Sequence, residues 1–373
     1  MQIQSITLKN FRNYEGQTVQ FDPHRNMIIG ENAQGKTNLV EAVYLCAFAR
    51  SFRTSNAQEM IRFGEKQASI DAEVVSEDIE KRIQILLRSD GKKMLKKDGK
   101  ILKRASDLLH TVVVVVFSPE DLRIIKDSPD KRRNFLDKEI SQLRPGYFES
   151  LHRYQEVLRQ KNAFLKQLIY KNSGMLPKDS EEEGVLDVLD MQLADYGIKV
   201  ILQRRAFVEL LNEEASKIQE GISGGREQLR ILYKETIDPE HFYETLIGER
   251  ERDFRNGSAG SGPHRDDLEF LINDKNAKKY GSQGQQRTIA LTLKLAEIRI
   301  AKSLLGENAI LLLDDVLSEL DKERQRYLLH NIDDIQIFIT SADADEELLA
   351  EVHKGKIFRV ENGRLTEEVT TGP

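Results

Sequence analysis

The segment from Asn26 to Leu39 constrains the fold of this chain most strongly. Residues 30–37 read Gly-Glu-Asn-Ala-Gln-Gly-Lys-Thr, which is the pattern G-x-x-x-x-G-K-T. An apolar run at residues 27–29 predicts a buried strand before it, and apolar residues at helical spacing follow from Leu39 onward. A strand, a glycine-containing loop and a helix in this order are typical of a phosphate-binding loop.

The chemistry of this loop predicts roles for its residues. Gly30 and Gly35 let the backbone curl so that several N–H groups point at an anion, and the helix that follows adds the positive end of its dipole. We expect Lys36 to reach the β- and γ-phosphates and the Thr37 hydroxyl to ligate Mg²⁺. The alternative is a glycine turn that binds nothing. The predicted ATP-binding residues of the loop are Gly30, Glu31, Asn32, Ala33, Gln34, Gly35, Lys36, Thr37 and Asn38.

A second buried strand is predicted at residues 309–313, and it ends in Asp314 and Asp315. Ligands bind at the carboxyl ends of strands in open α/β sheets. We expect Asp314 to hold Mg²⁺, and Asp315 to orient and deprotonate the attacking water, so Asp315 and Lys36 are the predicted catalytic residues. The alternative is a strand that simply ends in a polar turn.

A second anion-binding nest is predicted where Ser282 and a glycine open a helix, although many helices begin in this way. In ATPases with a phosphate loop, such a nest and a twin-carboxylate strand in this order, the nest of one subunit faces the phosphate loop of the other. ATP then holds a head-to-tail pair related by a two-fold axis. The nest comprises Ser282, Gln283, Gly284, Gln285, Gln286 and Arg287.

The chain between these motifs changes to a helical period. Apolar residues from 130 to about 222, interrupted by a polar link at 172–184, predict two helices packed antiparallel as an arm. A further helix is predicted to start at Ser118-Pro119-Glu120-Asp121. The predicted fold is α/β, a mixed sheet with a phosphate loop and an inserted antiparallel helical arm. Its expected divisions are residues 1–125, 126–225 and 226–373.

Composition narrows the class of protein. Charged residues make up 32% of the chain, the net charge is −6, and Cys46 is the only cysteine, which excludes an intramolecular disulfide. With no signal layout and no apolar run of membrane-spanning length, we expect a cytoplasmic protein without a membrane partner.

Two basic regions are candidates for contact with DNA phosphates, although a lysine-rich strand is more often a solvated edge. One is a predicted hairpin with Lys92, Lys93, Lys96, Lys97, Lys100, Lys103 and Arg104. The other is the arm, with Arg153, Arg159, Lys161, Lys166, Arg204 and Arg205.

Taken together, the motifs resemble the bacterial RecF family, whose members are related to the heads of SMC-type ATPases. The matching segments are Phe11–Tyr14, the phosphate loop, residues 118–121, residues 262–267 (Gly-Pro-His-Arg-Asp-Asp), the nest at 282–287 and residues 311–321.

The resemblance implies an ABC-type ATPase head that binds ATP and Mg²⁺, dimerises with ATP, and binds DNA at gaps and single-strand/double-strand junctions. It also implies work with RecR and RecO in loading RecA, and a part in the SOS response. Residues 282–287 match the family's signature motif, and Arg12 matches a basic residue that approaches the nucleotide.

Two departures from the broader ABC pattern stand out. Asp315 replaces the more common glutamate, which favours slow hydrolysis. No histidine follows the predicted strand at residues 335–339, where Thr340 and Ser341 stand instead. The alternatives within this fold are another SMC-like structural ATPase and a transporter ATPase. A non-hydrolysing ATP-dependent adaptor is the alternative from another class.

Overall fold

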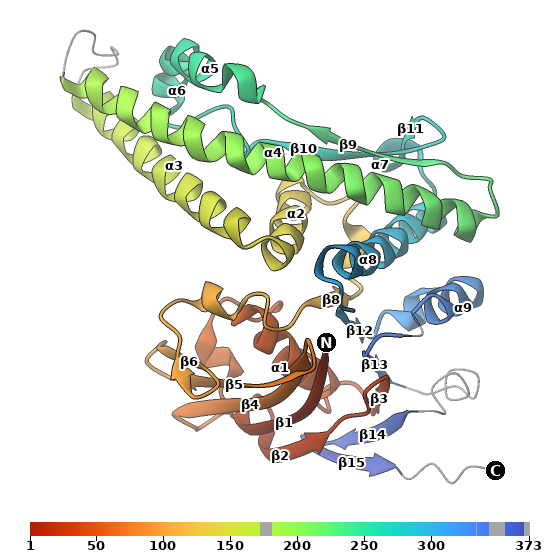
Figure 1. Ribbon diagram of the computed structural model, residues 1–373. Coiled ribbons are helices and arrows are strands. Elements are labelled where there is room, and N and C mark those ends of the chain that lie inside the picture. Colours follow the sequence, from red (N-terminus) through yellow and green to blue (C-terminus); the bar gives the residue numbers. More distant parts are fainter. Residues whose placement is uncertain (172–180, 333, 343–354, 369–373) are drawn as a thin grey trace. The chain divides into compact units, whose positions relative to one another are not determined.

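The phosphate-loop sequence forms the predicted strand, loop and helix, with β3 (Arg25–Ile29) before the loop and α1 (Lys36–Phe48) after it (Figure 1). The computed structural model describes residues 1–171, 181–332, 334–342 and 355–368. The chain divides into two compact units. The first is Met1–Arg123 with Gln283–Pro373, and the second is Ile124–Ser282.

A mainly parallel six-stranded sheet in the first unit carries the phosphate loop. Its strand order is β15-β14-β3-β13-β12-β8, and only the β14–β15 pair is antiparallel. Strands β8 and β12 are apolar runs buried along their length, as a covered parallel sheet requires. The other bounds are β8 (Val114–Phe117), β12 (Ile310–Asp314), β13 (Ile337–Ser341), β14 (Lys356–Glu361) and β15 (Arg364–Glu368).

The other sheet of the first unit is antiparallel, with the order β2-β1-β4-β5-β6-β7. Buried and exposed residues alternate along β4, so one face of this sheet packs on the core and the other meets solvent. The bounds are β1 (Gln2–Phe11), β2 (Tyr14–Gln20), β4 (Gln67–Ser76), β5 (Ile79–Arg88), β6 (Lys93–Lys97) and β7 (Lys100–Ile101).

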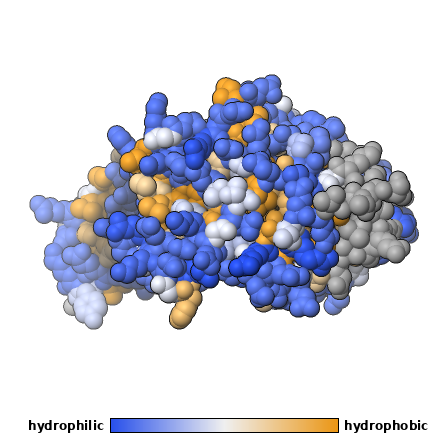
Figure 2. Space-filling view, turned by 90° about the horizontal axis from the view of Figure 1, so that it is seen from below, coloured by the Kyte–Doolittle hydropathy of each residue, from blue (hydrophilic) through white to orange (hydrophobic). Residues whose placement is uncertain are grey.

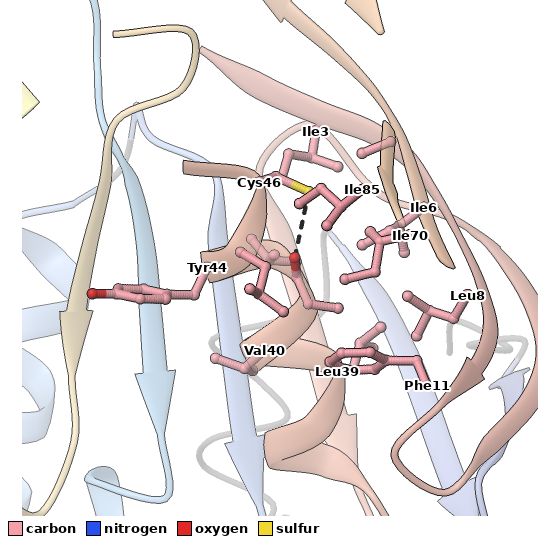
Figure 3. Packing of buried hydrophobic residues seen from close by; sticks show 14 of the residues in the cluster. Ile3, Ile6, Leu8, Phe11, Leu39, Val40, Tyr44, Cys46, Ile70 and Ile85 are labelled. Carbon is pink, nitrogen blue, oxygen red and sulfur yellow. Dashed lines mark hydrogen bonds between the residues drawn. The ribbon is translucent and has the colours of Figure 1, made fainter. Parts of the chain in front are cut away.

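Helix α1 is buried against the antiparallel sheet. Figure 3 shows Ile6, Leu8 and Ile70 of that sheet pointing toward the helix, where Leu39 and Cys46 lie. The Cys46 thiol donates to the Ala42 carbonyl oxygen at 3.4 Å, and burial raises its pKa to about 12. Cys46 is therefore a packing residue, and α1 holds the end of the phosphate loop on a rigid support.

The described residues of the first unit form further helices besides α1. They are α8 (Gln283–Leu305), α9 (Lys322–His330) and four short 3₁₀ helices, η1 (Ala57–Met60), η2 (Ala105–Leu108), η3 (Asp121–Arg123) and η5 (Leu317–Glu319). Figure 2 shows one face of the molecule, on which hydrophilic residues predominate and apolar residues form small groups. No helix in the described ranges is long and apolar enough to cross a membrane.

The expected helix at Ser118 is wrong. The Asp121 carboxylate accepts from both the backbone N–H and the hydroxyl of Ser118, each at 2.8 Å. This closes a local turn that leads only into the three-residue 3₁₀ helix η3. The next α-helix, α2, begins only at Pro129.

The second unit contains the predicted pair of long helices, α3 (Pro145–Lys171) and α4 (Glu181–Ser223), which lie side by side in Figure 1. The polar link predicted between them lies largely outside the described residues. The other elements are α2 (Pro129–Leu143), β9 (Leu229–Lys234), η4 (Pro239–His241), α5 (Phe242–Gly248), α6 (Arg250–Asn256), β10 (Asp267–Ile272), β11 (Lys275–Asn276) and α7 (Ala277–Tyr280).

This unit continues past residue 225, where we expected the inserted segment to end. Strands β9, β10 and β11 form a sheet of their own, and β9 packs on α4, so the unit runs to Ser282. The Gly-Pro-His-Arg-Asp-Asp segment lies within it. There the buried Asp266 carboxylate accepts from the Thr236 N–H at 2.8 Å, and Arg132 pairs with Asp267 at 2.6 Å. These contacts fix the turn that leads into β10.

Candidate active site

Both glycines of the phosphate loop lie so close to neighbouring residues that a Cβ would clash. Gly35 has a φ of +124°, and a Cβ there would lie 2.7 Å from the Asn13 amide. A Cβ on Gly30, whose φ is +155°, would lie 2.4 Å from the Val360 carbonyl oxygen. The Lys36 ammonium is buried within the curled loop, where it donates to the carbonyl oxygens of Gly30 at 2.7 Å and Glu31 at 3.2 Å. The loop thus places a cation at its centre.

The turn between β1 and β2 holds this loop in shape. The Asn13 amide donates to the Gln34 carbonyl oxygen at 2.6 Å and accepts from the Asn38 amide at 2.8 Å. The Tyr14 hydroxyl donates to the Gly35 carbonyl oxygen at 3.0 Å. These bonds from the β1–β2 turn fix both sides of the loop, so its curled shape is held by the protein's own residues.

The Arg12 guanidinium forms hydrogen bonds with other residues of the chain. Its Nε and Nη2 donate to the two carboxylate oxygens of Glu41 at 2.8 and 2.7 Å, and its Nη1 donates to the Glu59 carbonyl oxygen at 2.6 Å. Glu41 is a fully buried residue of α1. Arg12 therefore ties the β1–β2 turn to the helix of the phosphate loop, and a contact with nucleotide stays a prediction.

Two threonine hydroxyl groups, one from the phosphate loop and one from β13, bind the Asp314 carboxylate. The Thr37 hydroxyl donates to Asp314 Oδ1 at 3.0 Å, so the two predicted Mg²⁺ ligands lie together. Thr340, on the neighbouring strand β13, donates to the same oxygen at 2.9 Å, and its own hydroxyl oxygen accepts the Asp315 N–H at 2.9 Å. Asp315 has a φ of +52°, a conformation that is uncommon for a residue with a side chain. Thr340 thus fixes both carboxylate residues.

The pKa of the Asp314 carboxyl is raised above its ordinary value, mainly because burial disfavours the charged form. The nearby Asp315 carboxylate raises it further. Hydrogen bonds from Thr340 and Thr37 act in the opposite direction, as does the charge of Arg53. A cation at this position would favour the charged carboxylate, so the site is suited to bind one.

Sequence reasoning missed Arg53 and Thr340. Arg53 is partly exposed, and its Nη1 donates to the Asn38 side-chain oxygen at 2.8 Å, so it lies at the start of α1. No pattern in the sequence marks Arg53. The sequence assigned Thr340 no role beyond standing where many relatives have a histidine. Its position at the end of a predicted strand is the one signal that could have marked it as a site residue.

The signature segment lies where the sequence predicted it, at the start of α8, with Ser282 immediately before the helix. Arg324 of α9 donates to the Gly284 carbonyl oxygen at 3.2 Å and to the Thr288 hydroxyl at 2.8 Å. Arg287 donates to the Glu319 carbonyl oxygen at 2.6 Å. These contacts fix the first turn of α8.

Two of the basic arm residues are not surface residues. Arg204 is 1% exposed and donates to Asp137 at 2.7 Å and to the Pro263 carbonyl oxygen at 2.6 Å. Lys161 is fully buried between Asp190 and Asp253, at 2.8 and 2.9 Å. The expectation that these two contact DNA is therefore wrong, because their charges are already neutralised inside the unit. The other candidates are either exposed (Lys92, Lys93, Lys100, Lys103, Arg104, Arg153, Arg159 and Lys166) or partly exposed (Lys96, Lys97 and Arg205).

An ATPase head of the ABC type, with a helical arm inserted into it, is the class of protein that these sheets and this site define. The family model described as RecF/RecN/SMC N terminal domain matches residues 2–366. The chain belongs to the RecF family of DNA replication and repair proteins.

Individual relatives agree with this assignment. The DNA replication and repair protein RecF of Lachnospira eligens is 41% identical over 99% of this chain and 100% of its own. That of Agathobacter rectalis is 44% identical over 98% and 99%. A solved structure of the recombination mediator protein RecF-ATP in the RecFOR pathway has a TM-score of 0.88 at 35% identity, over 99% of this chain and 98% of its own. A crystal structure of the SmcHead, at 16% identity over 100% of this chain and 98% of its own, shares the fold with a TM-score of 0.59.

Proposed function

We propose that this chain is an ATP-dependent DNA clamp of recombinational repair and replication. ATP drives head-to-tail dimerisation at DNA gaps and single-strand/double-strand junctions, and slow hydrolysis releases the dimer. The observation that carries this proposal is the preformed contact of the phosphate loop with the paired carboxylates, through Thr37 and Asp314 at 3.0 Å. Solved relatives described as RecF-ATP and RecF-ATPrS support nucleotide binding by this chain.

Each residue of the site has a proposed role. The Lys36 ammonium exchanges its two carbonyl partners for oxygens of the β- and γ-phosphates. The Asp315 carboxylate orients the attacking water and accepts its proton. Residues 282–287 bind the γ-phosphate end of the ATP held by a second copy of the chain.

The donor set fits Mg²⁺, which takes oxygen ligands and keeps several waters, so that one or two protein ligands and the phosphates are enough. One hydroxyl and one carboxylate, those of Thr37 and Asp314, lie within hydrogen-bond distance and could hold it. When bound, the ion neutralises charge on the phosphates during hydrolysis.

The reaction is a weak, DNA-dependent hydrolysis of ATP to ADP and phosphate. Aspartate reaches less far than glutamate, so Asp315 is expected to activate water poorly, which suits a timing switch. Steady-state turnover on DNA far above about 1 s⁻¹, the low end of ordinary enzymes, would contradict this. The solved relatives are described as members of the RecFOR pathway, which supports the proposal that the clamp acts with RecR and RecO. We further propose that it helps to load RecA and supports SOS induction.

The test is the molar mass in solution, measured by light scattering with ATP and gapped DNA. Wild type is expected to double its mass with ATP and to bind the gapped DNA, whereas Lys36→Arg stays monomeric. A wild-type protein that stays monomeric with ATP, or that does not bind gapped DNA, would contradict the proposed clamp function. Dimerisation without any ATP turnover would favour the non-hydrolysing adaptor.

A further inference from the structure

The ammonium group of Lys294 is buried near the middle of α8, and the chemistry proposed for the ATP site gives it no role. Its side chain is 2% exposed and pairs with two carboxylates. That of Glu297, on the same helix, lies at 3.2 Å, and that of Asp121, in η3, lies at 3.3 Å. A buried cation with partners on two elements fixes how those elements meet, because moving either one leaves a buried charge unpaired.

The Asp121 carboxylate connects this cation to the end of β8. Its Oδ1 pairs with Lys294, whereas its Oδ2 accepts from the backbone N–H and the hydroxyl of Ser118, both at 2.8 Å. The Asp121 N–H donates back to the Ser118 carbonyl oxygen at 3.0 Å, and Ser118 directly follows β8. Residues 118–121, which were matched to the family on sequence alone, therefore join α8 to the end of β8.

The end of β8 lies at the same sheet edge as the paired carboxylates. Strands β8 and β12 are parallel neighbours, and Phe117 pairs with Leu313. The residues that come next along the two chains are Ser118 and Asp314. Helix α8 packs on both β8 and η3. A continuous set of contacts thus runs from the strand that carries the carboxylates, through β8 and Asp121, to α8.

The signature segment opens the helix that Lys294 anchors. An α-helix is stiff, so a shift of α8 at Lys294 also moves its first turn, roughly 16 Å away. In a dimer with a two-fold axis, each chain gives its loop and carboxylates to one ATP site and its signature to the other. Both sites can close only if the spacing between these two halves within one chain is right.

We propose that Lys294 is a positioning residue of the signature segment. Through Asp121 it holds α8 at the distance from the carboxylate strand that the partner chain's ATP requires. The inference rests on the proposed function and adds to it the contact that fixes one half of a site relative to the other. Lys294 therefore acts on the ATP held by the partner chain, and not on the ATP in its own phosphate loop.

The test places Lys294→Met on one chain of a mixed dimer at a time. An equal mixture of Lys36→Arg and Ser282→Arg chains has one intact site, with its loop from the Ser282→Arg chain and its signature from the Lys36→Arg chain. On the Lys36→Arg chain, Lys294→Met is expected to raise the dimer dissociation constant about tenfold, within the usual range of coupling between sites. On the Ser282→Arg chain it should leave that constant unchanged. Sedimentation equilibrium with a non-hydrolysable ATP analogue measures both.

Two further variants separate positioning from stability. Asp121→Asn removes the charge that holds Lys294 from η3, yet the cation keeps Glu297, so no buried charge is left alone. It should show the same difference between the two chains. Lys302→Met, at an exposed position of α8, is the matched control and should change neither constant. Equal weakening on both chains, or no weakening on either, overturns the proposal.

The two levels of proposal fail separately. If the mixture of Lys36→Arg and Ser282→Arg chains does not dimerise with the analogue, the proposed function fails, and the role of Lys294 fails with it. If the mixture dimerises, titration calorimetry of the monomeric Ser282→Arg protein isolates the chain's own loop. Lys294→Met should leave its affinity for the analogue unchanged. A tenfold loss there would show that Lys294 supports its own phosphate loop, which contradicts the inference and leaves the proposed function standing.

Discussion

At the scale of single residues, the hydroxyl of Thr340 connects the Asp314 carboxylate to the Asp315 backbone. It donates to Asp314 at 2.9 Å and accepts from the Asp315 backbone at 2.9 Å. Thr340 does not have to touch ATP, so it is a positioning residue.

Thr340→Val should lower kcat because it keeps the side-chain shape but removes both hydrogen bonds. A lost hydrogen bond to a charged group corresponds to about 2 kcal/mol, or roughly thirtyfold in rate. Thr340→Ser keeps the hydroxyl and should stay near wild type. Measured ATP turnover and the ATP dissociation constant separate this role from binding, because only turnover should change. Wild-type kcat in Thr340→Val would contradict the role.

Local patterns predicted some of these residues well and others poorly. Lys36, Thr37 and Asp314 follow from spacing and from the strand that precedes each motif. Thr340 binds Asp314, which is 26 residues away on the neighbouring strand. Predicting this contact requires the order of the strands in the sheet, which the sequence patterns did not give. Arg204 was wrongly placed on the surface although its spacing from Val200 and Phe207 is that of the buried stripe of α4. The error arose because the basic residues of the arm were listed without asking which face of the helix each one occupies.

At the scale of elements, buried charges hold the helices of the second unit together. Lys161 of α3 lies between Asp190 of α4 and Asp253 of α6, at 2.8 and 2.9 Å, with all three side chains inaccessible. Arg250 donates to the other oxygen of Asp190 at 2.7 Å. The helical period and the Pro/Gly link predicted α3 and α4. Cross-links between segments so distant in sequence could not be predicted.

Lys161→Met should destabilise this unit by roughly 3 kcal/mol, because it leaves two buried carboxylates without their shared cation. Lys166→Met, at an exposed position of the same helix, is the control and should change stability little. Urea unfolding followed by circular dichroism measures the difference. Equal stability of the two variants would show that the buried network contributes nothing.

His264 gives the second unit a pH dependence. Burial lowers its pKa to about 4, and its ring contacts the Tyr154 hydroxyl at 2.7 Å and the Ala259 carbonyl oxygen at 3.1 Å. The unfolded chain, with an ordinary pKa near 6.5, binds the extra proton first as pH falls. The contribution of His264 to the free energy of unfolding is therefore complete above about pH 6.5 and is lost between about pH 6.5 and 4. The loss reaches roughly 2 kcal/mol at pH 5.

Thermal melting of wild type and His264→Gln from pH 8 to pH 5 checks this sign. The wild-type melting temperature should fall more steeply than that of the variant below about pH 6.5. The difference isolates His264 from Asp266, whose pKa burial raises and which acts in the opposite direction. Parallel curves for the two proteins would contradict the assignment.

At the scale of the whole molecule, the surface that we propose to contact DNA has two candidates. Lys96 and Lys97 stand on β6, whereas Arg153 and Arg159 are exposed on α3. Charge reversal of each pair, with DNA affinity measured across salt concentrations, should reduce both the affinity and its salt slope only for the pair that contacts phosphates. A pair whose reversal changes neither quantity is excluded.

The central claim for the whole molecule is that one chain carries two halves of different ATP sites. Lys36→Arg damages the phosphate loop, and Ser282→Arg damages the signature segment. An equal mixture of the two variants can still form one site from an intact loop and an intact signature. The most direct measurement is the molar mass by light scattering with ATP and gapped DNA, for each variant alone and for the mixture. Monomers for each variant alone and dimers in the mixture are the predicted result; a mixture as monomeric as its components would contradict it.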